Sequence, residues 1–180
     1  MNIPTLHTER LILRPLASDD SHALTLLLSD GDVVSYMVTV PHILTELEAY
    51  AYIADIREKM AAGAEAYFAI TRPDDNLMMG AVALHIQAEH RRAELGYWLG
   101  TAYRGKGYMR EAVARVVRYA FEELNLNRLY GYAMTHNAAS ITVMEQAGFR
   151  YEGTLRQDTL RDTRRIDVSF YGLLREEYQG

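Results

Sequence analysis

Residues 100–112, GTAYRGKGYMREA, join an apolar run typical of a buried strand to an amphipathic run typical of a helix. Within this junction Lys106 lies between Gly105 and Gly107, and glycines let backbone N–H groups converge on a ligand. The start of the helix adds partial positive charge. The stretch therefore predicts a binding site for phosphate or pyrophosphate, with a tight turn that binds nothing as the alternative.

The composition is that of one folded domain, residues 1–180, because 49% of the residues are hydrophobic. The net charge of -5 argues against direct nucleic-acid binding and against attachment to an anionic membrane. The sequence has no run of about 18 or more apolar residues. Residues 1–4 also lack the layout of a signal peptide, so we expect a cytoplasmic protein.

The chain contains no cysteine, which excludes disulfides, thiolate metal sites and a cysteine nucleophile. Its six histidines form no HExxH motif and no pair at helical i, i+4 spacing. The sequence therefore predicts no metal site.

Hydrophobic periodicity and turn residues predict the order β α α β β β α β α β β, which gives a mixed sheet covered by helices. A strand–helix–strand crossover places the 104–109 loop at the carboxyl end of its strand, where open α/β sheets bind ligands. The expected strands are 9–16, 66–71, 77–86, 91–99, 128–134, 149–157 and 165–174, and the expected helices are 18–30, 45–63, 107–124 and 137–147.

Three phosphate-binding motifs compete for the loop. A Walker A loop requires Ser or Thr after its Gly-Lys pair, but Gly107 follows Lys106. A dinucleotide fingerprint requires a third glycine where Arg110 stands. The remaining motif, Gln/Arg-x-x-Gly-x-Gly/Ala, is matched by residues 104–109 except at Met109. In this respect the loop resembles the acetyl-coenzyme A loop of the GNAT acetyltransferases.

The resemblance extends along residues 8–178. Residues 8–16, TERLILRPL, residues 93–98, AELGYW, and residues 137–149, NAASITVMEQAGF, are similar to the ribosomal-protein N-acetyltransferase (RimJ/RimL) branch. The resemblance implies an α/β (α+β) GNAT fold: a mixed, mostly antiparallel central sheet of six to seven strands flanked by about four helices. It also implies transfer of an acetyl group from acetyl-coenzyme A to a primary amine without a metal.

The same resemblance implies how the donor is held. Its pyrophosphate would bind backbone N–H groups of residues 105–109, while Arg104 and Lys106 add positive charge. Its pantetheine arm would pair with the backbone of residues 97–99 like an added strand. The implied cofactor-binding residues are Tyr97, Trp98, Leu99, Arg104, Gly105, Lys106, Gly107, Tyr108, Met109 and Asn137.

Glu94 is the candidate proton acceptor, because direct transfer needs a neutral amine and most amines are protonated at neutral pH. In an alternating strand Glu94 shares a face with Gly96 and Trp98, and its position resembles that of the glutamate assigned this task in the family. An ion pair with Arg91 or Arg92 on a solvated strand is the alternative.

Ser140 is the second catalytic candidate, since many relatives carry a tyrosine or serine here that donates a hydrogen bond to the departing sulfur. The alternative is that Asn137 and Ser140 only form a helix N-cap with its N3 residue. For Asn137 we expect both a capping role and a cofactor contact. His136 is a lower-ranked candidate base.

The expected acceptor is the N-terminus of a protein or peptide, because the resemblance is to the ribosomal-protein branch. Residues 90–94, HRRAE, also resemble spermidine acetyltransferases, so a small amine such as a polyamine, amino acid or drug is an alternative. A coenzyme A binding or regulatory module without turnover is a third interpretation. Tyr36, Met37, Trp98 and residues 30–45 are candidates for the acceptor site, and a homodimer is left open.

Overall fold

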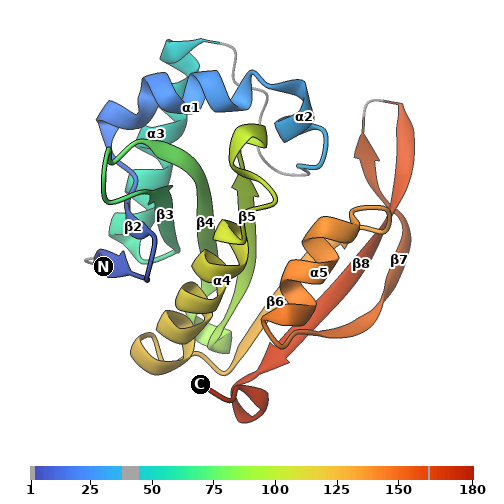
Figure 1. The fold of residues 1–180 in the computed structure, drawn as a ribbon. Helices are drawn as coiled ribbons and strands as arrows, with labels where there is room; N and C mark the ends of the chain where they lie inside the picture. Colours follow the sequence, from blue (N-terminus) through green and yellow to red (C-terminus); the bar gives the residue numbers. More distant parts are fainter. Residues whose placement is uncertain (1–2, 38–44, 162) are drawn as a thin grey trace.

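The computed structural model describes residues 3–37, 45–161 and 163–180. In these residues one eight-stranded sheet has the order β1-β2-β3-β4-β5-β6-β8-β7 (Figure 1). The strands are β1 (Leu6–His7), β2 (Ile12–Pro15), β3 (Glu65–Thr71), β4 (Met78–Gln87), β5 (Arg92–Leu99), β6 (Arg128–Met134), β7 (Arg150–Arg161) and β8 (Arg164–Leu174). The α-helices are α1 (Ser21–Leu28), α2 (Gly31–Val34), α3 (Glu46–Ala62), α4 (Tyr108–Arg118) and α5 (Ala138–Gln146); a π-helical turn, Tyr119–Glu123, continues α4.

The predicted class is confirmed, but the described residues form eight strands and five α-helices rather than six to seven strands and about four helices. The additional strand is β1, whose two residues pair with Ile12 and Leu13 and are too few to show a periodic pattern. The additional helix is α2, a single turn that starts where the Asp30 carboxylate accepts a hydrogen bond from the Asp32 N–H. None of the described helices is long and apolar enough to cross a membrane.

Helices cover both faces of the sheet. On β3, the Tyr67 ring packs against Tyr52 of α3, with ring centroids 6.4 Å apart. The next residue, Phe68, packs on the opposite face against Tyr119, which follows α4. Figure 1 shows α5 beside α4 over that second face. We refer to the two sides as the α3 face and the α4–α5 face.

The sheet opens between β5 and β6. These two strands are parallel, and their pairing covers only residues 92–94 of β5 and 128–130 of β6. Beyond these pairs the strands diverge toward their carboxyl ends (Figure 1). The backbone of β5 after Glu94 therefore lacks a strand partner on the β6 side, while its other side remains paired with β4.

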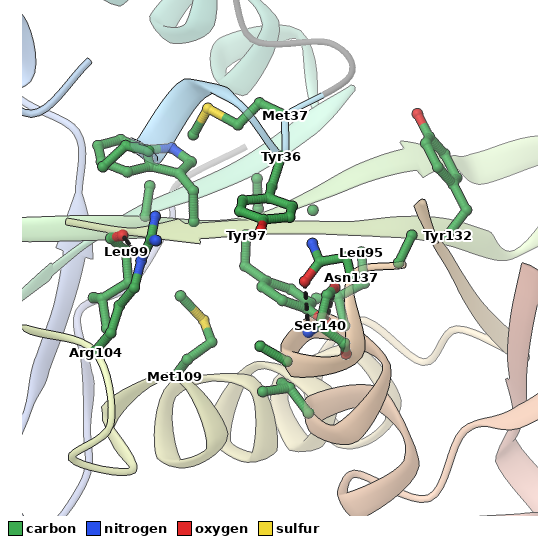
Figure 2. Close-up of a pocket in the computed structure, with 18 of the residues that line it drawn as sticks. Tyr36, Met37, Leu95, Tyr97, Leu99, Arg104, Met109, Tyr132, Asn137 and Ser140 are labelled. Carbon is green, nitrogen blue, oxygen red and sulfur yellow. Dashed lines mark hydrogen bonds between the residues drawn. The ribbon is translucent and has the colours of Figure 1, made fainter. Parts of the chain in front are cut away.

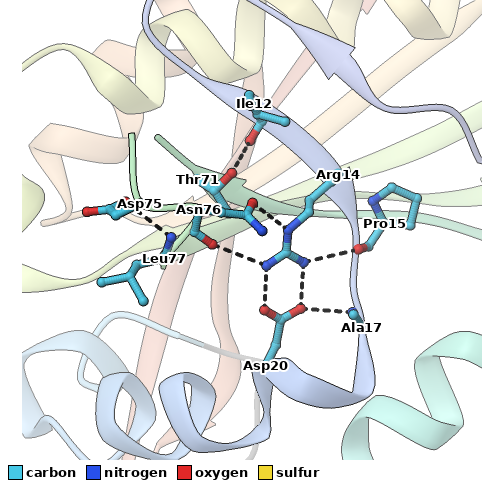
Figure 3. Close-up of polar contacts among 9 residues, drawn as sticks. All are labelled: Ile12, Arg14, Pro15, Ala17, Asp20, Thr71, Asp75, Asn76 and Leu77. Carbon is cyan, nitrogen blue, oxygen red and sulfur yellow. Dashed lines mark hydrogen bonds and ion pairs between the residues drawn. The ribbon is translucent and has the colours of Figure 1, made fainter. Parts of the chain in front are cut away.

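A buried ion pair fixes the end of β2 beside the start of α1 (Figure 3). The Arg14 guanidinium donates to both carboxylate oxygens of Asp20, at 2.8 and 2.7 Å. It also donates to Oδ1 of Asn76, in the turn between β3 and β4. The Asp20 side chain is only 6% exposed, and removing one partner of such a pair costs about 3–5 kcal/mol. The pair therefore contributes to positioning α1 against the sheet.

Candidate active site

The loop between β5 and α4 has the backbone geometry of an anion site. Gly105 and Gly107 have φ angles of 74° and 79°, in the left-handed region that favours glycine. Gly107 is the N-cap of α4, and among the described residues no side chain caps this helix. The first N–H groups of α4 are therefore left for a ligand. By contrast, Asn137 caps α5 by accepting a hydrogen bond from the Ser140 N–H at 3.1 Å.

The two cations predicted to assist the loop make hydrogen bonds to the protein itself. Arg104 donates to the carbonyl oxygen of Leu99 at 3.1 Å and to that of Asp32 at 3.2 Å. Lys106 Nζ donates to the carbonyl oxygen of Ala102 at 3.1 Å. Both side chains therefore stabilise the loop and contribute charge near it.

Arg10 also supports the loop, a role that sequence reasoning did not assign. Its guanidinium donates to the Lys106 carbonyl oxygen at 3.0 Å and lies 4.9 Å from the ring centroid of Tyr108. It also pairs with Glu111 in the first turn of α4, which accepts a hydrogen bond from Thr8. Burial raises the pKa of Glu111, but the hydrogen bonds from Thr8 and Arg10 outweigh it and lower that pKa below its ordinary value.

A cavity of about 1060 Å³ lies at the opening between β5 and β6 and is lined from both faces of the sheet. Figure 2 shows Tyr36 and Met37 on one side of the strands, and Met109, Asn137 and Ser140 on the helix side. Lys106 is the one predicted site residue that does not line this cavity. The structure brings together the others: Glu94, Tyr97, Trp98, Leu99, Arg104, Gly105, Gly107, Tyr108, Met109, Asn137 and Ser140.

On the α4–α5 face, Ser140 forms a hydroxyl pair with Tyr97. The Tyr97 hydroxyl lies 2.9 Å from Ser140 Oγ and donates to the Ser140 carbonyl oxygen, also at 2.9 Å. Burial raises the pKa of Tyr97 to about 12, against the opposing effect of its hydrogen bond with Ser140. Either hydroxyl can be the donor in this contact, and when Tyr97 donates to Ser140 Oγ, the Ser140 proton is left to form a hydrogen bond into the cavity.

On the α3 face, Glu94 lines the cavity without the ion pair considered from sequence. Arg91 donates to the carbonyl oxygen of Asn125, and Arg92 donates to Gln87. In the part of the chain that the structure describes, neither arginine forms an ion pair with Glu94. The Glu94 carboxylate therefore faces the cavity without either arginine as its partner, and it interacts with the Tyr132 hydroxyl.

Aromatic side chains form much of the remaining wall on this face. Tyr36 and Met37, two of the acceptor-site candidates, line the cavity, and Trp98 donates to the Tyr67 hydroxyl at 3.3 Å. His136 also lines it, with its ring 6.1 Å from that of Tyr36. Burial, and secondarily the charge of Glu94, raise the pKa of Tyr132. Of the predicted 30–45 segment, residues 38–44 lie outside the described residues.

Sequence reasoning missed Glu65 and His85, which line the same face of the cavity. Glu65 Oε1 lies 3.1 Å from His85 Nδ1. The signal available in the sequence was a polar residue immediately before one predicted strand, at 65, and another near the end of the next, at 85. Strand register, which the sequence does not state, is needed to join them.

A profile of the acetyltransferase (GNAT) domain matches residues 10–150. The chain belongs to the GNAT acetyltransferase family. It is 35% identical over 178 residues to the uncharacterized N-acetyltransferase p20 of Bacillus licheniformis, covering 98% of this chain and 99% of p20. It is 26% identical to a spermidine N(1)-acetyltransferase of Vibrio cholerae over 170 residues, 94% of this chain and 95% of that one.

The solved structures agree with this GNAT assignment at the level of the fold. RimL, a ribosomal L7/L12 α-N-protein acetyltransferase solved in complex with coenzyme A, superposes with a TM-score of 0.88. The match covers 95% of this chain and 98% of RimL at 19% identity. The protein is thus an N-acetyltransferase of the GNAT family. Its relatives and structural neighbours include enzymes named for two different acceptors, a ribosomal protein and spermidine.

Proposed function

We propose that this GNAT enzyme binds acetyl-coenzyme A on the α4–α5 face and acetylates a primary amine that enters from the α3 face. The observation that carries the proposal is that one continuous cavity at the opening between β5 and β6 is lined both by the uncapped start of α4 and by Glu94. Because the cavity is lined from both faces, a thioester and an amine can meet without moving a strand.

The residues on the α4–α5 face suit the donor. Backbone N–H groups of Gly105, Gly107 and the first turn of α4 bind the pyrophosphate, with Arg104 and Lys106 adding charge. The unpaired side of β5, at residues 97–99, binds the amides of the pantetheine arm. Met109 and Asn137 line the same part of the cavity.

The chemistry divides between the two faces. Glu94 accepts a proton from the bound ammonium, so that the neutral amine can attack the thioester carbonyl carbon. The carbon–nitrogen bond forms, the carbon–sulfur bond breaks, and the second amine proton completes the thiol of coenzyme A. Ser140, in its pair with Tyr97, donates a hydrogen bond to the departing sulfur.

The acceptor proposed first is the N-terminus of a protein or peptide, supported by the similarity to the ribosomal-protein branch. A polyamine is the second candidate, supported by the spermidine acetyltransferase relative and by the two carboxylates, Glu65 and Glu94, on the α3 face. Carboxylates on the acceptor side favour a substrate with more than one cationic group.

The test is an assay of released coenzyme A with a thiol reagent, for which a cysteine-free protein gives no background. Peptides with free N-termini, polyamines and amino acids are compared, with acetylated peptides as matched controls. Turnover of peptides supports the first acceptor, and turnover of polyamines alone replaces it with the second. Tight binding of acetyl-coenzyme A without turnover of any amine contradicts the proposal.

A further inference from the structure

Three ionisable side chains form one row across the α3 face of the sheet. Glu65 of β3 is the direct register partner of His85 in β4, and His85 is the direct partner of Glu94 in β5. Directly paired residues project to the same face, with Cβ atoms about 4.5–5.5 Å apart. All three line the cavity. We call Glu65, His85 and Glu94 the transverse row.

Glu65, the first member of the row, is buried, and only one of its two carboxylate oxygens has a hydrogen-bond partner among the described residues. The Glu65 side chain is 9% exposed, and its Oε1 atom pairs with His85 Nδ1. Lys59 Nζ lies 3.9 Å from the same oxygen but is engaged at 2.7 Å by Asp55. Among the described residues Oε2 of Glu65 has no hydrogen-bond partner. A buried carboxylate is costly unless it is paired, so Glu65 depends on the His85 ring.

The other ring nitrogen of His85 lies toward the floor of the cavity. With Nδ1 held by Glu65, Nε2 lies 3.6 Å from the position that a Cβ atom would occupy on Gly96. Gly96 follows Glu94 on the same face of β5. The His85 side chain is 41% exposed, so the ring that neighbours Glu94 across the β4–β5 pairing also reaches solvent.

We propose that the transverse row carries the proton of the acceptor amine away from the reaction site, from Glu94 to Nε2 of His85 and then to solvent. This inference rests on the proposed function. Acetylation of an ammonium releases one net proton: Glu94 takes it from nitrogen, and His85 takes it from Glu94, which restores the carboxylate. The imidazolium is stabilised by Glu65 until it loses the proton to water. Glu65 is a positioning residue for the His85 ring.

The electrostatics of His85 suit this task. Its hydrogen bond with Glu65 raises the pKa of His85 above 6.5, and the charges of Glu65 and Glu94 act in the same direction. Burial and the charge of Lys59 oppose this shift. A raised histidine pKa brings the group closer to neutral pH, where proton exchange in both directions is efficient.

The experiment measures kcat and KM of wild type, His85→Gln and Glu65→Gln across about pH 6 to 9. The acceptor is the amine that wild type acetylates fastest among the peptides, polyamines and amino acids compared above, which we call the acceptor panel. The matched control is His90→Gln, an exposed histidine outside the cavity. We expect His85→Gln to lower kcat at neutral pH by about 10-fold or more and to leave the KM for acetyl-coenzyme A unchanged. His85→Ala should regain part of its kcat when imidazole is added.

Glu65→Gln provides the second test, because glutamine can still accept a hydrogen bond from the ring but carries no charge. Only neutral His85 can accept a proton, so kcat falls as the pH drops through the His85 pKa. Loss of the Glu65 charge should lower that pKa and move this fall to more acidic pH. An NMR titration of the His85 ring in both proteins measures the pKa independently of turnover.

The possible failures are distinguishable. If wild type acetylates no amine, the proposed function is wrong. The proton relay from Glu94 through His85 to solvent, which rests on that function, is then wrong as well. If wild type is active but His85→Gln matches His90→Gln in kcat and pH profile, the relay alone is wrong. An unchanged kcat profile in Glu65→Gln, despite a lowered His85 pKa by NMR, also overturns the relay.

Discussion

The two faces of the cavity are built from different kinds of structure. On the α4–α5 face the proposed donor contacts come mainly from main-chain groups in one continuous segment, residues 97–109. On the α3 face the groups proposed to accept and carry away the proton are side chains at positions 65, 85 and 94, which three separate strands bring into one row. A main-chain site tolerates side-chain changes that preserve the backbone, whereas a side-chain site does not. Substitutions on the two faces should therefore have separable effects on donor affinity and on turnover.

The largest expected effect is on the α3 face. Glu94→Gln removes the proposed proton acceptor and should lower kcat by about 100-fold, the lower end of the range for general acid–base catalysis. Acetyl-coenzyme A affinity, measured by calorimetry, should stay within about twofold because the donor is held on the other face. Glu89→Gln, an equivalent charge change at an exposed position, is the control. Unchanged turnover across about pH 6 to 9 would remove Glu94 from the mechanism.

The corresponding change on the α4–α5 face is Gly105→Val. A β-branched residue at φ 74° is strained, and about 1–3 kcal/mol of strain corresponds to roughly 5- to 150-fold in affinity. We expect acetyl-coenzyme A to bind about 10-fold more weakly or worse. Gly153→Val is the matched control: Gly153 also has positive φ and no atom within 4 Å of an added Cβ, but it does not line the cavity. Equal loss of affinity in both variants would contradict the main-chain anion site.

A smaller effect is expected for Ser140→Ala. Loss of one hydrogen bond to a developing thiolate, about 1.5 kcal/mol, corresponds to about a 10-fold lower kcat. In this variant the Tyr97 hydroxyl keeps its main-chain acceptor, the carbonyl oxygen of residue 140, so the substitution removes the serine hydroxyl alone. Thr142→Ala removes an exposed hydroxyl from the same helix and is the control. Wild-type turnover by Ser140→Ala would end the proposed leaving-group role.

The smallest expected effect is a pH-dependent difference in stability. The folded state raises the pKa of His85 above its ordinary 6.5, so its ion pair stabilises the protein fully below that pH and less as the pH rises through the folded value. The free energy of unfolding of wild type should exceed that of His85→Gln by more at about pH 5.5 than at about pH 8.5. Urea titrations measure both differences. A difference that grows with pH would have the wrong sign for a His85–Glu65 pair.

Features that depend on residues close together in the chain were predicted from the sequence better than features that join distant residues. The caps of α3 illustrate what local signals achieve: Thr45 accepts a hydrogen bond from the Glu48 N–H, and Gly63 ends the helix at φ 76°. The turn at Gly105 and Gly107 was also predicted from the sequence, because its backbone conformation is one that favours glycine at both positions. The strand β1 and the single turn α2 were missed because each is too short to show a period.

The transverse row could not be predicted because it depends on register. A role for His85 can be inferred only after β4 is aligned with β3 and β5, because that alignment makes Glu65 and Glu94 its neighbours. The Tyr97–Ser140 hydroxyl pair depends instead on how a helix packs on the sheet, because it joins a strand to a helix 43 residues later. Alternation within a single strand was enough to place Glu94 on the face of Gly96 and Trp98, and its role as proton acceptor stays a prediction.

The proposal that the donor and the acceptor bind on opposite faces of the sheet is tested most directly by an NMR titration. Coenzyme A is added first, followed by the amine that the acceptor panel identifies. Because coenzyme A carries no acetyl group, no turnover intervenes. Coenzyme A alone should shift the backbone amides of residues 104–109 and leave the His85 ring resonances in place, and the amine should then shift the His85 ring. A titration in which coenzyme A moves the His85 resonances as strongly as those of Gly105 and Gly107 would contradict the separation of donor and acceptor across the sheet.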